Sequence, residues 1–139
     1  MAKDEESTRN LTLIEYYKQQ LESIDLQLSY LQSTLAEYQR AKLTVEQLHD
    51  ADKNSEILIP LGAGTFLNGT LTNTSNILLG VGAGLVVEKT TDEVVIKLEE
   101  RIKRIQENLE KMASLGQKIQ SDAEELSRKT QQMMEETQQ

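Results

Sequence analysis

Residues 57–67 read ILIPLGAGTFL, and residues 77–87 read ILLGVGAGLVV. The two segments are a repeat, and each places a Gly-Ala-Gly turn between two apolar runs. Glycine adopts positive φ at little cost, and apolar flanks rich in Ile, Leu and Val favour strands. Each segment therefore predicts a β-hairpin, and residues 68–76, which are rich in Asn, Thr and Gly, are expected to connect the two hairpins as a loop.

Two hairpins are not a stable sheet in isolation, because their outer strands leave backbone groups unpaired and their apolar faces uncovered. The chain offers no other segment with strand character, so the missing strands must come from other subunits. The sequence thus predicts that residues 55–91 form an assembly platform. The apolar side chains expected to make the assembly contacts are Ile57, Ile59, Leu61, Phe66, Leu67, Ile77, Leu79, Val81 and Val86.

A long helix is predicted before the platform, because apolar residues and tyrosines recur there in alternating steps of three and four. This spacing is typical of the buried seam of a coiled coil. The seam positions are Ile14, Tyr17, Leu21, Ile24, Leu28, Leu31, Leu35, Tyr38, Lys42, Val45 and His49, of which Lys42 and His49 weaken the far end. Thr12 with Glu15 predicts a capping box at the start of the helix, although Ser7 or Thr8 could start it a turn earlier. Residues 50–55 are expected to end it.

A second long helix is predicted after the platform, and Thr90 with Glu93 forms a capping-box pattern at its start. Gly116 lies on its seam, where it either loosens the packing locally or is a tolerated small residue opposite a large one. The seam positions are Val95, Leu98, Ile102, Ile105, Leu109, Met112, Gly116, Ile119, Ala123, Leu126, Thr130 and Met133.

The two seams have similar lengths, which predicts that they pair with each other in an antiparallel coiled coil with both termini at one tip. Partners across such a seam have residue numbers that add to a constant, and we predict 147, so that Leu28 meets Ile119 and Leu31 meets Gly116. A slip of one heptad stays open. The predicted fold class is α+β: an N-terminal coiled-coil helix in residues 1–54, two central β-hairpins in 55–91 and a C-terminal coiled-coil helix in 92–139.

The composition argues against several classes of function. The formal charge of −8 would repel the phosphate backbone, so no nucleic-acid partner is expected. The absence of Cys excludes disulfides and thiolate chemistry. The most apolar window, residues 77–87, is much shorter than the roughly 20 residues of a membrane helix, so we expect a soluble, intracellular protein without a membrane partner.

No catalytic or cofactor site is predicted. The Gly-Ala-Gly turns are not phosphate-binding loops, because Leu67 and Val87 occupy the places of the last glycine of G-x-G-x-x-G. His49 is the only histidine, and its position near a helix C-terminus explains it better than a role as ligand or base. We therefore expect no enzyme activity, no cofactor and no metal.

The predicted tip carries more apolar residues than a two-helix seam can bury. Leu11, Leu13 and Tyr16 lie off the first seam, and Met134 lies off the second beside Met133. Exposed apolar groups suit contacts with other apolar surfaces, and Met adapts to varied ones. Simple fraying of the helix ends is the alternative. The candidate binding residues at the tip are Leu11, Leu13, Ile14, Tyr16, Tyr17, Met133 and Met134.

The order of a long helix, two glycine-turn hairpins and a second long helix resembles the α-class subunits of the prefoldin family. The most specific parts are residues 57–67 and residues 81–89, which read VGAGLVVEK and are similar to the archaeal α subunit. The resemblance implies a cytoplasmic hexamer of two α-class and four β-class subunits, in which the hairpins join an oligomeric β-barrel body that carries coiled-coil arms.

The resemblance also implies a function. Subunits of this family are chaperones that work without ATP, bind unfolded client proteins at the arm tips, prevent their aggregation and deliver them to a group II chaperonin. A competing possibility is an oligomeric coiled-coil scaffold that holds folded partners. An enzyme is a distant third possibility.

Overall fold

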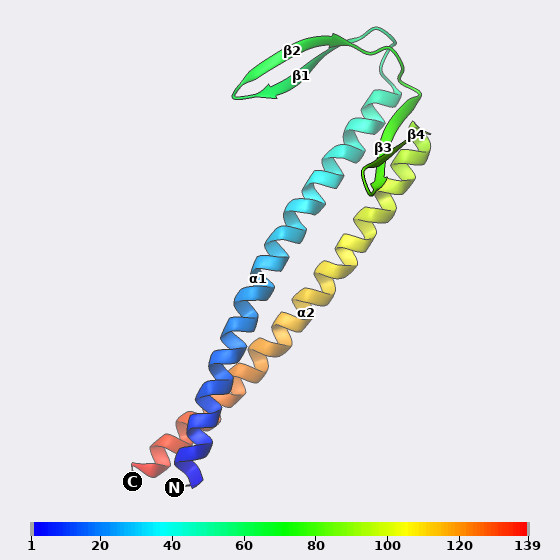
Figure 1. Ribbon diagram of the computed structural model, residues 1–139. Coiled ribbons are helices and arrows are strands. Elements are labelled where there is room, and N and C mark those ends of the chain that lie inside the picture. The colour runs from blue at the N-terminus through cyan, green and yellow to red at the C-terminus, as the bar shows by residue number, and fades with distance from the viewer. Residues whose placement is uncertain (1, 139) are drawn as a thin grey trace. The chain divides into compact units, whose positions relative to one another are not determined.

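The computed structural model describes residues 2–138 as two long helices separated by two β-hairpins (Figure 1). The elements are α1 (Ala2–His49), β1 (Glu56–Gly62), β2 (Thr65–Thr70), β3 (Asn76–Gly82), β4 (Leu85–Thr90) and α2 (Thr91–Thr137). The predicted α+β class and the order of its elements are confirmed. The chain divides into a terminal unit, Met1–Thr34 with Ile105–Gln139, and a hairpin unit, Leu35–Arg104.

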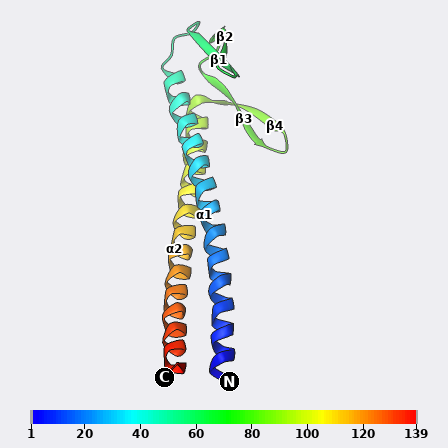
Figure 2. The ribbon, with the colours of Figure 1, turned by 90° about the vertical axis from the view of Figure 1, so that its left-hand side faces the viewer.

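The two hairpins form separate two-stranded antiparallel sheets, β1–β2 and β3–β4 (Figure 2). Each turn needs positive φ, which Gly62, Ala63 and Gly64 adopt in the first hairpin with values of 107°, 51° and 74°. The predicted loop of residues 68–76 is too long, because Leu58 pairs with Asn68 and Ile57 with Gly69. Backbone pairing therefore extends β2 to Thr70 and begins β3 at Asn76, although Asn and Gly are typical loop residues.

The two helix starts differ in how well the sequence predicted them. α1 begins at Ala2, so the predicted starts at Ser7, Thr8 and Thr12 are wrong. Thr12 lies inside the helix, and its hydroxyl donates a hydrogen bond to the Thr8 carbonyl at 3.0 Å instead of capping a helix end. The capping box of α2 is confirmed: Glu93 N–H donates to Thr90 Oγ1 and Thr90 N–H donates to the Glu93 carboxylate, both at 3.2 Å.

The predicted seams are the buried stripes of both helices, except that the stripe of α2 starts with the buried Val94, which was not predicted, and not with the half-buried Val95. In the terminal unit Ile24, Ile105, Ile119 and Thr130 are buried, and the remaining seam positions within residues 14–34 and 105–133 are half-buried. In the hairpin unit the seam residues are likewise buried or half-buried, except His49, which is an exposed residue.

The structure corrects the predicted pairing register by one heptad. In the terminal unit a Cβ added to Gly116 would lie 3.4 Å from Ile24 Cγ2, and Lys3 Nζ lies 3.7 Å from Glu136. In the hairpin unit Lys42 Nζ lies 3.2 Å from Glu99. The residue numbers of these pairs add to values between 139 and 141, so the predicted constant of 147 is wrong.

The contact of Gly116 shows which residue faces it across the seam and why the sequence did not predict this. Gly116 is a small residue opposite a large one, as one of the two predictions held, but the large residue is Ile24 and not Leu31. A slip by seven residues puts apolar positions back onto apolar positions, so the periodicity of the seams alone could not distinguish the two registers.

A pair of cysteines should report the observed register. Leu28→Cys with Met112→Cys should form a disulfide within one chain, because these positions add to the observed constant of about 140 and antiparallel partners lie within disulfide reach. The chain has no other cysteine, so non-reducing gel mobility measures the bond directly.

Leu28→Cys with Ile119→Cys is the matched control. Its second position is displaced by two helical turns, about 10 Å along α2, and should stay reduced. Preferential crosslinking of the control pair would restore the register predicted from the sequence.

The hydrophobic core of the hairpin unit joins both helices to the second hairpin. Val45 from α1, Leu79 from β3, and Val94 and Leu98 from α2 are buried together. Partly buried side chains pack around them: Tyr38, Ala41, Ile77, Val87 and Val95. Neither helix in the described residues 2–138 is apolar enough over a sufficient length to cross a membrane.

Candidate functional site

The first hairpin exposes apolar side chains on both of its faces. Side chains alternate along a strand, so Ile59 and its partner Leu67 lie on one face, and Leu58 and Phe66 lie on the other. All four are exposed, as is Leu61 near the turn. Only Ile57, of the assembly residues predicted in this hairpin, is half-buried.

The second hairpin presents only one open face. Leu79 is 7% exposed and packs in the core of the hairpin unit, with Ile77 and Val87 beside it. Val86, on the opposite face, and Val81, near the turn, are exposed. The structure therefore places two of the predicted assembly residues, Ile77 and Leu79, against the chain's own helices.

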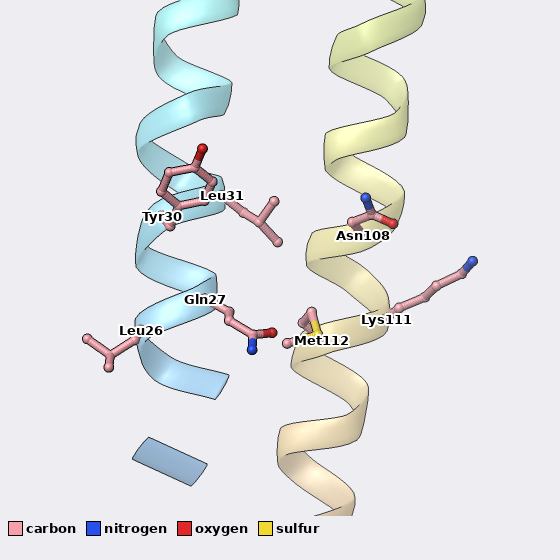
Figure 3. A pocket seen from close by; sticks show the side chains of 7 residues that line it. All are labelled: Leu26, Gln27, Tyr30, Leu31, Asn108, Lys111 and Met112. Atoms are coloured by element: carbon pink, nitrogen blue, oxygen red, sulfur yellow. The ribbon is translucent and has the colours of Figure 1, made fainter. Parts of the chain in front are cut away.

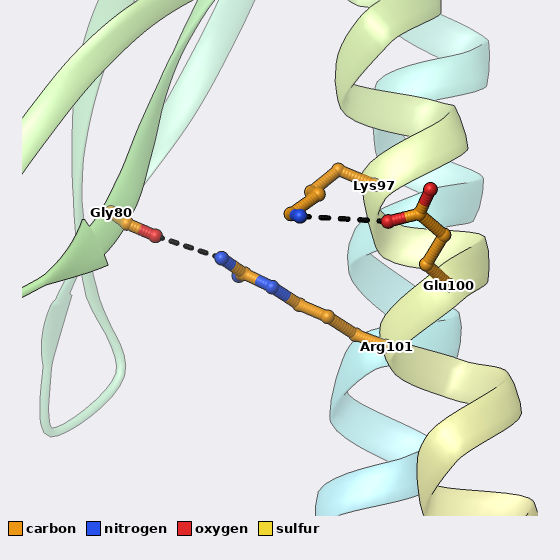
Figure 4. A network of polar contacts seen from close by, with 4 residues as sticks. All are labelled: Gly80, Lys97, Glu100 and Arg101. Atoms are coloured by element: carbon orange, nitrogen blue, oxygen red, sulfur yellow. Dashed lines mark hydrogen bonds and ion pairs between the residues drawn. The ribbon is translucent and has the colours of Figure 1, made fainter.

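A polar contact also holds the second hairpin on α2. The guanidinium group of Arg101 donates a hydrogen bond to the Gly80 carbonyl at 3.0 Å, while Lys97 and Glu100 pair along the helix at 3.5 Å (Figure 4). The contact links β3 to the helix that follows the hairpin, and it supplements the packing of Leu79.

Three exposed apolar residues were missed by the sequence prediction. Leu58, Leu78 and Leu85 are all at least 65% exposed, and each lies on a strand beside predicted assembly residues. The unbroken apolar runs at residues 57–59, 77–79 and 85–87 carried this signal, because a strand with apolar residues in consecutive positions is typically covered on both faces.

The structure separates the predicted tip residues into groups. Leu11 and Met134, both exposed, line one shallow cavity of about 360 Å³ together with polar residues of both helices. Leu13 and Tyr16 are also exposed but lie on another side of α1, since two residues turn a helix by roughly 200°.

The other tip residues belong to the seam. Ile14, Tyr17 and Met133 are half-buried in the terminal unit. The rings of Tyr16 and Tyr17 are 6.4 Å apart between centroids, so the half-buried ring supports the exposed one. The apolar excess at the tip is thus a surface feature of Leu11, Leu13, Tyr16 and Met134.

Lys42, a polar residue near the C-terminal end of the first seam, stabilises the pairing of the helices through an ion pair. A hydrogen bond to Glu99, supported by the charge of Glu46, raises the pKa of Lys42. A raised pKa stabilises the folded chain below the pKa of the unfolded state, and this contribution is lost as the pH rises through the raised value. The Lys42 side chain is only half-buried and remains in contact with water, which screens the ion pair, so the effect is small.

His49 has a structural contact in the hairpin unit. Its Nδ1 lies 2.8 Å from Oγ1 of Thr91, whose residue is buried at the start of α2. Within residues 2–138 no group of three His, Cys, Asp or Glu side chains is placed to hold a metal ion.

Comparison with known proteins assigns the architecture to a family. A family model described as "Prefoldin subunit" matches residues 17–138. Prefoldin subunit alpha 1 of Thermococcus kodakarensis is 43% identical over 67 residues, a match that covers 48% of this chain and about half, 46%, of that protein. Prefoldin subunit alpha of Methanococcoides burtonii is 37% identical over 98 residues, which cover 70% of this chain and 71% of that protein.

A solved structure has the same fold. The cryo-EM structure of filamentous PFD from Methanocaldococcus jannaschii superposes with a TM-score of 0.74 at 17% identity and covers 84% of this chain and 97% of that chain. At that identity the similarity concerns the fold alone. Since the family model spans most of the sequence and the α-subunit relative is matched over more than two thirds of both chains, this chain belongs to the prefoldin family as a member of its α class.

Proposed function

We propose that this chain is the α-class subunit of a cytoplasmic chaperone complex that works without ATP, prevents the aggregation of unfolded polypeptides and delivers them to a group II chaperonin. The observation that carries the proposal is that large apolar side chains are exposed in two places, on the hairpins and at the tip of the helices. The delivery step rests on membership of the prefoldin family.

The hairpins support assembly with other subunits. Two-stranded sheets with apolar groups open to water gain stability when further strands pair with their edges and cover their faces. Leu58, Leu61 and Phe66 on the first hairpin and Val81 and Val86 on the second are the exposed groups available for this. We infer a complex of two α-class with four β-class subunits, joined through a β-barrel body.

The tip supports binding of clients. Unfolded polypeptides share exposed apolar groups and not a common sequence, so a binding surface for them is apolar and adaptable. Leu11, Leu13, Tyr16 and Met134 offer such groups but little area on one arm. Each contact is therefore weak, and several arms that act on one client raise the total affinity through effective concentration.

Light scattering tests the proposed function. The chain is combined with a β-class subunit, and denatured rhodanese is diluted into the mixture without ATP. We expect the complex to suppress the rise in scattering, and added salt to change this little, because salt screens charges and leaves apolar contacts intact.

The chain without its β-class partner is the control, and it should protect the client poorly because single arms bind weakly. A complex that assembles but leaves aggregation unchanged would contradict the chaperone function and favour the scaffold alternative.

A further inference from the structure

One side of α1 in the terminal unit has no charged residue between residues 12 and 34. We call this side the uncharged flank; it follows the seam in steps of three and four. Its members are Thr12, Leu13, Tyr16, Gln19, Gln20, Ser23, Leu26, Gln27, Tyr30, Ser33 and Thr34. Of the charged residues in the same stretch, Lys18 and Asp25 lie well away from the flank, whereas Glu15 and Glu22 border it, Glu22 one turn before Leu26.

The uncharged flank includes the two most exposed large apolar or aromatic residues of the terminal unit. Leu26 is 73% exposed and Tyr30 is 71% exposed. They lie about four turns further from the tip than Leu13 and Tyr16, so they do not belong to frayed ends of the helix. A helix surface in water normally carries charged residues at such positions.

Leu26 and Tyr30 border a groove between α1 and α2 within the terminal unit. The groove has a volume of about 520 Å³ and is lined by Leu26, Gln27, Tyr30, Leu31, Asn108, Lys111 and Met112. Leu31, Gln27 and Met112 point into the space between the helices, whereas Leu26 points away from α2 (Figure 3). Among these lining residues Lys111, on α2, is the one with a charge, and those from α1 are all uncharged.

The absence of charge on this flank contrasts with the rest of the terminal unit. That unit has seven Lys and Arg against thirteen Asp and Glu, a formal charge of −6. An unfolded client can carry either sign of charge, and a surface without charged groups binds both without repulsion. The flank is therefore the part of the unit best suited to clients of any charge.

The polar members of the flank suit an extended backbone. Gln amides donate and accept hydrogen bonds, and so do the hydroxyls of Tyr and Ser, which matches the unpaired N–H and C=O groups of an unfolded chain. Gln20 Nε2 already donates to the Tyr16 hydroxyl at 2.8 Å, which orders these two side chains. From Leu13 to Tyr30 the flank is about 25 Å long, the length of roughly eight extended residues.

We propose that the uncharged flank binds an extended apolar segment of unfolded polypeptide, with Leu26 and Tyr30 as the main contacts beyond the tip. This rests on the proposed chaperone function and adds a second client surface, on a side of α1 other than that of Leu11. A second copy of the terminal unit fits less well, because it would add another charge of −6 and press Gln19, Gln20 and Ser23 against their counterparts.

A matched pair of double variants in the assembled complex tests the proposal. Leu26→Asp with Tyr30→Asp alters the flank, and Ser29→Asp with Gln32→Asp adds the same charge to the same turns on the other side of α1. Ser29 and Gln32 are exposed, so both variants should retain the helix and the mass of the complex. The probe is fluorescent, reduced and carboxymethylated lactalbumin, which stays unfolded.

We expect the flank variant to bind the probe about tenfold more weakly, since the partial burial of two large side chains is lost, and the control to change less than about twofold. Charge repulsion alone would weaken both variants equally. Equal losses, or no loss in the flank variant, would overturn the proposal. If the wild-type complex nevertheless binds the probe, the proposed chaperone function is still supported and only the flank proposal fails.

A photocrosslinking residue in place of Tyr30 identifies the occupant. It should capture the labelled probe, whereas the same residue in place of Ser29 should not. Capture of another subunit at position 30, with no capture of the probe, would make the flank a contact between arms and overturn the proposal. A wild-type complex that neither binds the probe nor suppresses aggregation would instead contradict the chaperone function itself.

Discussion

Replacing Leu61 and Val81 by Asp should release the chain from its complex with β-class subunits while both helices stay folded. Both side chains are exposed in the single chain, so neither substitution disturbs the core of Val45, Leu79, Val94 and Leu98. In the assembled β body the same positions would be covered, and a buried carboxylate without a partner is strongly unfavourable. We expect a loss of affinity between subunits of more than about a hundredfold.

Sedimentation measures the mass of the complex, and circular dichroism measures the helices. The matched control, Thr72→Asp with Asn73→Asp, adds the same charge to the exposed connection between the hairpins and should leave the mass unchanged. An unchanged mass for the Leu61 and Val81 variant would refute assembly through the hairpins. Leu79→Asp should behave differently and lower the melting temperature of the chain itself, because Leu79 is in its own core.

The architecture could be predicted from the sequence because each element carries a strong local pattern. The steps of three and four along Ile14–Val45 require a helix with one buried side, and the Gly-Ala-Gly turns supply positive φ where the strands reverse. The cap at Thr90 and Glu93 was found for the same reason, since both partners lie within one turn. Thr12 and Glu15 show the same pattern inside a helix, where local sequence alone misleads.

The pairing register could not be predicted, because it depends on contacts between residues far apart in the sequence. Two registers a heptad apart bury nearly the same apolar groups. What distinguishes them includes the contact of Gly116 with Ile24, the ion pair of Lys42 with Glu99 and the link of His49 to Thr91. The polar residues Lys42 and His49 interrupt the apolar pattern of the seam and are among those that specify its alignment.

The candidate surfaces were predicted in part. Leu11, Leu13, Tyr16 and Met134 were identified because they fall outside the seam, and all four are exposed. The sequence could not show that Leu79 is covered by the chain's own helices, because this depends on how the second hairpin packs. Leu26 and Tyr30 also fall outside the seam, but they lie away from the tip and were not singled out.

Removing residues 1–14 together with residues 126–139 should abolish most of the suppression of aggregation without changing how many subunits assemble. The two cuts match each other in the observed register, in which residue numbers across the seam add to about 140. The deletion takes away Leu11, Leu13 and Met134 and leaves the hairpin unit intact. We expect on the order of ten times more complex to be needed for the same protection, because both α-class arms lose their tips and the contributions of the arms combine.

Light scattering of denatured rhodanese measures this loss, and sedimentation confirms that the complex still assembles. Met134→Ser is the comparison variant and should lose much less, since one side chain is a small part of the surface that the arms offer together. The uncharged flank from Tyr16 to Thr34 survives the truncation, so the residual binding by this chain should disappear when Leu26→Asp and Tyr30→Asp are added. A truncated complex that holds unfolded client at full strength would exclude the tip as the main site and leave the flank of α1 or the hairpin unit to bind it.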